Sequence, residues 1–111
     1  MNVAEGSFKE ENLNTENMKP LNIHRVEQEL IELSDWKYED DKIEKKFEFN
    51  DFKEALAFIV RVGIEAEAQA HHPNLHNVYN QVTISLQTHD AGNKVTEKDI
   101  KLAKAIESIR K

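Results

Sequence analysis

Apolar residues recur at helical spacing in two separate stretches, one after residue 22 and one near the end of the chain. The first such pattern follows Asn22, a favourable N-cap residue, and ends near Ser34. Its apolar stripe consists of Ile23, Val26, Leu30 and Leu33. The last pattern opens at Thr96, which forms a capping-box-like start with Asp99, and continues to Ile109. Each pattern predicts one amphipathic helix.

A longer helical pattern occupies the middle of the chain. It begins at Phe52, directly after Asn50 or Asp51, either of which can cap a helix. Alanines alternate with larger apolar residues along it and allow close packing. Because the ring of Pro73 disfavours helical backbone in the residue before it, we expect the helix to end at about His71.

The remaining apolar positions alternate with polar ones, as in strands. Residues 36–38 and 43–49, joined by a charged link, predict a hairpin. Residues 78–88 also alternate, and the Asn80-Gln81 pair inside them is either a tight turn or part of the strand. Trp36, Tyr79 and the phenylalanines are predicted to lie in the core.

The order of these elements defines the fold class. We expect an α+β protein with a four-stranded antiparallel sheet and three helices packed on one face, in the order α-β-β-α-β-β-α. Residues 1–19 mix Asn, Glu, Gly and Ser without periodicity, so we expect a flexible N-terminal tail. Residues 20–111 are expected to form a single domain.

Length, charge and cysteine content narrow the function. The chain has 111 residues, the length of one ordinary domain, and its net charge of −6 disfavours nucleic-acid binding. The lack of cysteine excludes a disulfide scaffold, a cysteine-ligated zinc site and a thiol nucleophile. No stretch reaches the roughly 20 apolar residues that span a membrane, and no signal-peptide pattern is present, so we expect a cytoplasmic protein. Only 39% of residues are hydrophobic, so the core is either thin or completed by a partner subunit, and we expect a homodimer or homotetramer.

The histidines are the candidates for chemistry. Four of the 5 histidines lie between positions 71 and 89. Histidine titrates near neutral pH, so His71, His72 and His89 around one cleft would supply an acid and a base without a cofactor. Glu67 lies four residues before His71 and could orient its ring. His89 ends the last strand, followed by Asp90 and a glycine-containing loop.

Two other interpretations of the same residues remain open. A His-His-Pro segment is commonly a helix end with solvated rings, and Glu67 with His71 is equally a helix-surface pair. Three imidazoles and a carboxylate would also suit zinc, but the spacing matches no zinc motif and the H-E-x-x-H pattern is missing, so we rank a metal site below acid–base use.

The segment from Glu67 to Asp90 resembles the signature of the pterin-4a-carbinolamine dehydratases. The features it shares with them are a carboxylate four residues before His71-His72-Pro73, an aromatic residue at Tyr79, and Thr88-His89-Asp90 at the end of the next strand. The resemblance extends more loosely from Trp36 to the last helix. It implies that residues 20–111 form one domain of this family.

The resemblance also implies an activity and a site. Members remove water from 4a-hydroxytetrahydropterin to give quinonoid dihydropterin, as part of tetrahydrobiopterin recycling, and need no cofactor or metal. By position, His71 and His89 would be the acid–base pair, His72 would hold the pterin, and Glu67 would orient His71. The substrate site would be lined by His71, His72, Pro73, Thr88, His89, Asp90 and Ala91.

The family also suggests partners and two departures. An aromatic amino acid hydroxylase would supply the substrate, and animal members additionally act as dimerisation cofactors of a transcription factor, so a non-catalytic protein-binding module is the alternative. Leu75 stands where many relatives have tryptophan, and the loop at residues 91–95 is one residue longer than in animal forms. With Leu75 in place of tryptophan, the pterin site would lack one aromatic side chain. We expect this to weaken pterin binding and to leave the three histidines unaffected.

Overall fold

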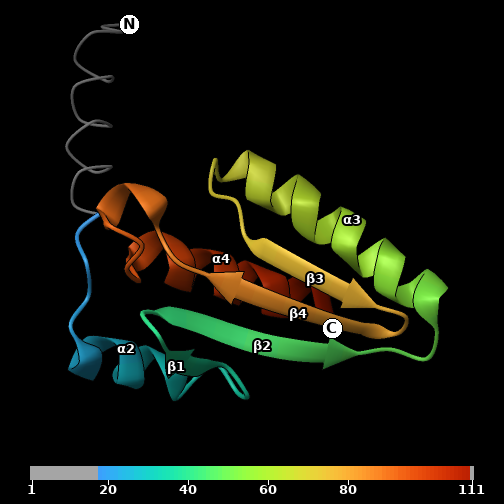
Figure 1. Cartoon of the computed structure of the whole chain (residues 1–111), viewed down its shortest axis with the longest axis horizontal. Coiled ribbons are helices and arrows are strands. Elements are labelled where there is room, and N and C mark those ends of the chain that lie inside the picture. Colours follow the sequence, from blue (N-terminus) through green and yellow to red (C-terminus); the bar gives the residue numbers. More distant parts are fainter. Residues whose placement is uncertain (1–17, 111) are drawn as a thin grey trace, which may run out of the picture.

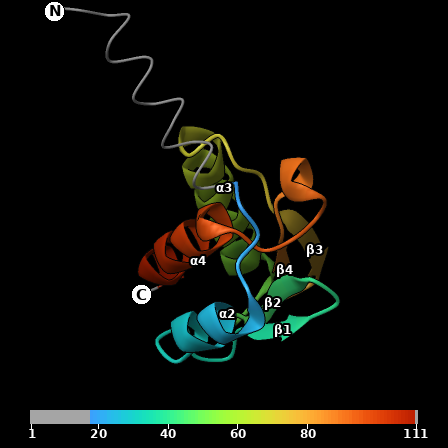
Figure 2. The same cartoon turned by 90° about the vertical axis from the view of Figure 1, so that its left-hand side faces the viewer.

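The computed structural model describes residues 18–110, which form one antiparallel sheet with helices on one side (Figures 1 and 2). The elements in chain order are α2 (Ile23–Leu30), β1 (Lys37–Glu39), β2 (Lys42–Glu48), α3 (Phe52–Ala68), β3 (Asn74–Val78), β4 (Gln81–Leu86), the short 3₁₀ helix η1 (His89–Ala91) and α4 (Glu97–Arg110). The strand order is β1-β2-β4-β3. The predicted fold class and element order are confirmed, whereas the predicted tail lies outside the described residues except for Met18 and Lys19.

The first helix begins where the sequence predicts and ends earlier. The Asn22 side chain accepts a hydrogen bond from the Arg25 amide at 2.8 Å, as expected of an N-cap. After Leu30 the backbone tightens into i→i+3 hydrogen bonds, among them one from the Leu33 amide to the Leu30 carbonyl. The α-helix therefore stops at Leu30 rather than near Ser34, and the tighter turn places Leu33 in the core.

Two-residue turns join β1 to β2 and β3 to β4. Asp40 and Asp41 have positive φ angles of 52° and 60°, the backbone that a tight hairpin between β1 and β2 requires. Tyr79 also has a positive φ, and Val78 pairs with Gln81 on its far side. The turn therefore consists of Tyr79 and Asn80, one residue earlier than the Asn80-Gln81 pair, and Gln81 already belongs to β4. The strand before this turn, β3, starts at Asn74 rather than at the expected Val78.

The long helix α3 has a well-formed start and an abrupt end. Asp51 caps it by accepting from the Glu54 amide at 2.8 Å. At the other end Ala70 adopts a left-handed φ of 53°, and the His71 amide donates to the Ala66 carbonyl. This bond is typical of a helix-terminating turn, so α3 ends at Ala68, three residues before the predicted His71.

The core lies between the sheet and the helices. Alternation along β2 and β4 points one side chain in two toward α3 and α4. Buried residues of the sheet are Ile43, Phe47, Val82, Ile84 and Leu86, and those of the two helices are Ala55, Phe58, Val62, Ala66, Ile100, Leu102, Ala103 and Ile106. Trp36 is buried as predicted, but Tyr79 and Phe52 are exposed, contrary to expectation.

The opposite face of the sheet is polar. Thr83, Ser85 and Gln87 point outward between the buried residues of β4. No helix within residues 18–110 covers this face, as Figure 2 shows. None of the described helices is both long and apolar enough to cross a membrane.

Candidate active site

His71 is turned into the protein by the end of α3. The left-handed backbone at Ala70 directs the following residue away from the helix surface, and His71 is only 8% exposed. Its ring nitrogen Nε2 lies 2.6 Å from Oδ1 of Asp99, on the first turn of α4. His71 is therefore held by a carboxylate from a different element, 28 residues further along the chain.

Asp99 is itself held by a hydrogen-bond network. It is fully buried, and its Oδ2 accepts from the Thr88 hydroxyl and from the Thr96 amide, both at 2.8 Å. The Thr88 and Thr96 hydroxyls are 2.6 Å apart, and because Thr88 uses its proton on Asp99, Thr96 is the donor between them. Both Asp99 oxygens are thus occupied, which fixes the direction from which Oδ1 meets the His71 ring.

Glu67 does not contact His71, which corrects the expected pairing. Its Oε1 lies 2.8 Å from Nε2 of His72 instead. The i, i+4 rule fails here because α3 ends at Ala68, so His71 no longer lies on the same helix face as Glu67. The Glu67–His72 pair is exposed, with 81% and 66% of the two side chains accessible, in contrast to the buried His71–Asp99 pair.

His89 approaches from the other side of the site. It begins the 3₁₀ helix η1 after β4, and its Nδ1 lies 3.2 Å from the side-chain oxygen of Asn93. The loop between them is closed by Gly92 at a φ of 73° and by backbone bonding between Thr88 and Lys94. His89 is therefore exposed on a short, internally bonded loop.

An ion pair ties this loop to the β1–β2 turn. The Asp41 carboxylate lies 2.8 Å from Nζ of Lys94 and raises the pKa of that ammonium above its ordinary value, mainly through the hydrogen bond. The Gln87 side chain donates to the backbone carbonyls of Asp41 and Asn93. Together these contacts hold the loop that follows His89 against the β1–β2 turn.

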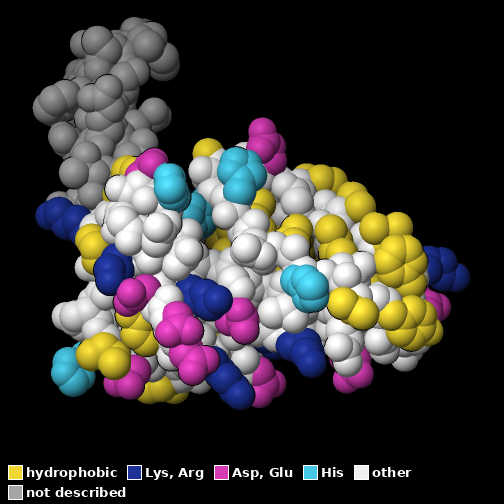
Figure 3. Space-filling view, in the orientation of Figure 1, with side chains coloured by type: hydrophobic (Ala, Val, Ile, Leu, Met, Phe, Trp, Pro, Cys, Tyr) yellow, Lys and Arg dark blue, Asp and Glu magenta, His cyan; other side chains and the backbone are white. Residues whose placement is uncertain are grey.

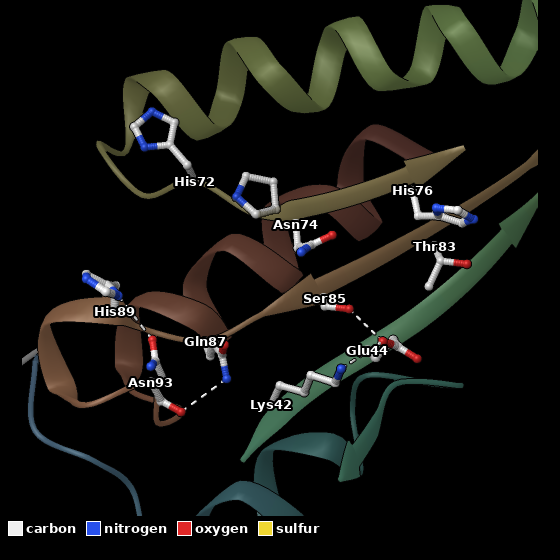
Figure 4. Close-up of a pocket in the computed structure, with 11 residues that line it drawn as sticks. Lys42, Glu44, His72, Asn74, His76, Thr83, Ser85, Gln87, His89 and Asn93 are labelled. Atoms are coloured by element: carbon white, nitrogen blue, oxygen red, sulfur yellow. Dashed lines mark hydrogen bonds and ion pairs between the residues drawn. The ribbon is translucent and has the colours of Figure 1, made fainter. Parts of the chain in front are cut away.

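Two adjoining cavities bring most of the predicted residues together. The smaller, of about 220 Å³, is lined by Met18, Ala70, His71, His72, Gln87, Thr88, His89, Asp90 and Lys98. The larger, of about 580 Å³, lies on the outer sheet face and contains His72, Pro73 and His89 among its walls (Figure 4). Of the predicted site residues, Glu67 and Ala91 line neither cavity.

Leu75 also lines neither cavity. It lies between Asn74 and His76 on β3, and strand alternation turns it to the opposite side from these two groove residues. The weaker binding expected from this substitution therefore finds no direct support in the cavity walls.

The sequence did not reveal the role of Asp99. The Thr96 and Asp99 spacing predicts a helix cap, and that prediction is confirmed by the bond from the Thr96 amide to Asp99. The same carboxylate uses its other oxygen for His71. No spacing rule connects residues on α3 and α4, so only the packing of these helices could show this second use.

Within residues 18–110, no group of three or more His, Asp or Glu side chains has a geometry that could hold a metal ion. The arrangement instead offers three imidazoles at different depths around one cavity. One is buried and anchored, and two are exposed at the rim, which suits proton transfer to and from a bound molecule.

Comparison with known proteins agrees with this arrangement. Residues 19–109 match the family model described as pterin 4 alpha carbinolamine dehydratase. The chain belongs to this dehydratase family. The match confirms the resemblance inferred from the histidine segment.

Individual members of the dehydratase family align over most of the chain. A protein of Opitutus terrae is 51% identical over 84 residues, 76% of this chain and 87% of its own. One of Christiangramia forsetii is 48% identical over 92 residues, 83% of this chain and 94% of its own. Both are provisionally named pterin-4-alpha-carbinolamine dehydratases.

The fold is also that of a solved structure in the family. The crystal structure of a protein from Brucella melitensis, described as a transcriptional coactivator/pterin dehydratase, superposes with a TM-score of 0.78 at 35% identity. The alignment covers 82% of this chain and 98% of that one.

Proposed function

We propose that the protein is a dehydratase that converts 4a-hydroxytetrahydropterin to quinonoid dihydropterin by histidine acid–base catalysis, in tetrahydrobiopterin recycling. The observation that carries this proposal is the convergence of His71, His72 and His89 on one cavity of about 220 Å³. Membership of the dehydratase family supports the same reaction.

The chemistry needs two proton transfers and no change of oxidation state. The bond between C4a and its hydroxyl oxygen breaks, and a proton delivered to that oxygen lets it leave as water. The neighbouring N5 loses its proton, and the C4a–N5 double bond forms. Substrate and product differ only by water, so the reaction requires no oxidant or reductant.

We assign the two proton transfers to His71 and His89. His71 is fixed by the buried Asp99, which suits a group that must hold one orientation. His89 faces the same cavity from η1, on a separate element. His72 then holds the pterin, and Glu67 positions His72 rather than His71.

The remaining predicted residues form walls. Thr88 and Asp90 line the smaller cavity, and Pro73 lines the larger one. Ala91 lies in η1 directly after Asp90, so its part is to hold the loop.

The test is the rate at which chemically generated 4a-hydroxytetrahydropterin loses water, followed by ultraviolet absorbance with and without the protein. We expect wild type to accelerate this step strongly, and His71→Gln to lose about 100-fold or more of the acceleration, since acid–base catalysis typically contributes that much. A folded wild type that leaves the buffer rate unchanged would refute the proposal.

We further propose that two or four copies of the chain associate through α3. Phe52, Leu56, Val60 and Ile64 recur every four residues along this helix and are between 46% and 67% exposed. Figure 3 shows hydrophobic surface gathered on the α3 side of the molecule. A stripe of this kind is typical of a surface that a partner covers.

Charges beside the stripe favour a second copy as that partner. Lys53 and Arg61 lie eight residues, or about two turns, apart along the helix, and Glu54 and Glu65 lie near its two ends. In an antiparallel pair centred between Leu56 and Val60, each cation meets a carboxylate of the other copy.

Light scattering after gel filtration tests this association. We expect Val60→Asp to lower the measured mass toward that of one chain. Ile31→Asp is the matched control, because Ile31 is 80% exposed but lies beyond α2, outside the stripe. A single-chain mass for wild type would refute the proposal.

The same stripe favours one alternative function, a protein-binding module without catalytic activity. It predicts that wild type and His71→Gln behave identically in the dehydration assay, which separates it from the enzyme. If the protein is the dehydratase, its substrate must come from a reaction that hydroxylates C4a of a pterin, such as that of an aromatic amino acid hydroxylase. We propose that the protein and this hydroxylase both act in the cytoplasm.

A further inference from the structure

The cavity on the outer sheet face is larger than the proposed reaction requires. The two cavities share His72, Gln87 and His89, so one ligand can occupy both. A bicyclic pterin ring is of a size to fill the smaller space of about 220 Å³. The adjoining space of about 580 Å³ would then remain for whatever is attached to the ring.

The larger cavity is a groove that follows the strands away from the histidine site. Asn74 pairs with Ser85 across β3 and β4, and His76 pairs with Thr83 one step further. Successive residues on one face of a strand are about 7 Å apart, so the groove continues well past the first pair. Figure 4 shows these side chains leading from His72 along the outer face.

Several groups in this groove have hydrogen-bonding capacity to spare. Among residues 18–110, the side chains of Asn74, His76 and Thr83 have no hydrogen-bond or ion-pair partner. They provide amide, imidazole and hydroxyl groups in one line. Unused donors and acceptors of this kind suit a ligand that carries several hydroxyl groups.

The groove has little net charge to attract an anion. Lys42 lies 3.7 Å from Glu44, and the Ser85 hydroxyl donates to the same Glu44 oxygen at 2.6 Å. The one lysine among the cavity walls is thus matched by the one carboxylate. This pairing favours an uncharged ligand over one that ends in carboxylates.

We propose that this groove binds an extended, uncharged, hydroxyl-bearing substituent at C6 of the pterin, of the length of a sugar-bearing side chain. The inference rests on the proposed dehydratase function and names its substrate class. A short substituent would reach only Asn74 and Ser85, whereas one sugar unit more would reach His76 and Thr83.

The experiment compares two substrates with the same ring. One is the carbinolamine of 6-methyltetrahydropterin, and the other carries at C6 a three-carbon diol joined to one glucose. We expect wild type to show a kcat/KM about tenfold higher for the long substrate, as one or two net hydrogen bonds would give. The double variant His76→Ala, Thr83→Ala should lose most of this preference.

Gln81→Ala is the matched control for the double variant. Gln81 lies on the same outer face of β4 but outside the groove, so its substitution should leave the preference unchanged. If wild type catalyses dehydration, the lack of any preference for the long substrate, or a double variant that keeps the preference, would overturn the proposal.

Binding of stable oxidised pterins separates this inference from the proposed reaction. Pterin fluorescence gives a Kd for ring systems that carry the methyl or the glucosyl-diol side chain, whether or not the protein catalyses dehydration. Tighter binding of the long pterin, weakened in the double variant, supports the groove even if neither carbinolamine reacts faster. Tighter binding of a pterin whose side chain ends in carboxylates would overturn the choice of an uncharged ligand.

Discussion

The two neighbouring histidines differ in almost every physical respect. His71 is buried and faces a carboxylate that is itself fully satisfied by Thr88 and Thr96. His72 is exposed, and its ring pairs with the likewise exposed side chain of Glu67. When one member of a buried pair is removed, the remaining polar group cannot bond to water, so stability falls strongly. When one member of an exposed pair is removed, water takes its place and little stability is lost. Adjacent residues of one type can therefore carry different shares of stability and of catalysis.

The largest effect is expected from Asp99→Asn. The amide keeps the shape of the side chain but cannot accept all three hydrogen bonds, so the free energy of unfolding should fall by about 3 kcal/mol. The maximal dehydration rate should fall about 100-fold because His71 loses its fixed orientation. Urea denaturation and stopped-flow absorbance measure the two quantities. A folded variant with normal kcat would show that Asp99 is only a cap.

His89→Ala should reduce the rate about as strongly without destabilising the fold. The ring of His89 is exposed and shares one hydrogen bond with the nearby Asn93, so we expect a change in unfolding free energy below about 0.5 kcal/mol. The loss of one acid–base group should still lower kcat about 100-fold. A small kcat change with a raised KM would instead make His89 a binding residue.

Thr88→Val tests whether the network, and not only Asp99, holds His71. Valine has nearly the same shape but cannot donate to Asp99 or accept from Thr96, and we expect a loss of about 1–2 kcal/mol in stability. A kcat reduction of roughly tenfold should accompany it. Thr83→Val, at an outward position on β4, is the control and should leave kcat for the 6-methyl substrate within about twofold.

Glu67→Gln should have a much smaller effect than Asp99→Asn. The pair with His72 is solvent-exposed, so its contribution to stability is expected to be about 0.5 kcal/mol or less. We expect KM to rise about threefold at most while kcat is kept. A kcat loss as large as that of Asp99→Asn would mean that Glu67 contacts His71 during catalysis, which would reverse the comparison.

The smallest effect on activity is expected from Glu29→Gln, which lies away from the site and should change how stability depends on pH. The hydrogen bond from Arg25 lowers the pKa of Glu29, against an opposing contribution from partial burial. A lowered folded-state pKa means that the stabilisation is present above the ordinary value of 4.5 and is lost as the pH falls through the lowered pKa. The stability difference between wild type and Glu29→Gln should therefore be full at pH 7 and vanish in acid, with activity at pH 7 unaffected.

Much of the fold follows from local pattern. Asn22 and Asp51 cap helices where the sequence predicts caps, and alternation along β4 separates buried from outward residues. The exact ends of elements were less predictable. Leu33 and Ala70 lie in tight turns at the ends of helices. Their conformation depends on the direction of the next element, which local helix propensity does not specify.

By itself, the sequence determined the element order and the fold class, and it predicted His71, His72 and His89 as site residues. These follow from periodicity and from motif spacing, which are properties of neighbouring residues. Only the tertiary structure decided that Asp99 faces His71, that Glu67 turns to His72, and that the groove beyond Asn74 is open. The physical reason is that such contacts join elements whose separation along the chain carries no regular spacing. They are set by where α3 stops and by how α4 packs against it.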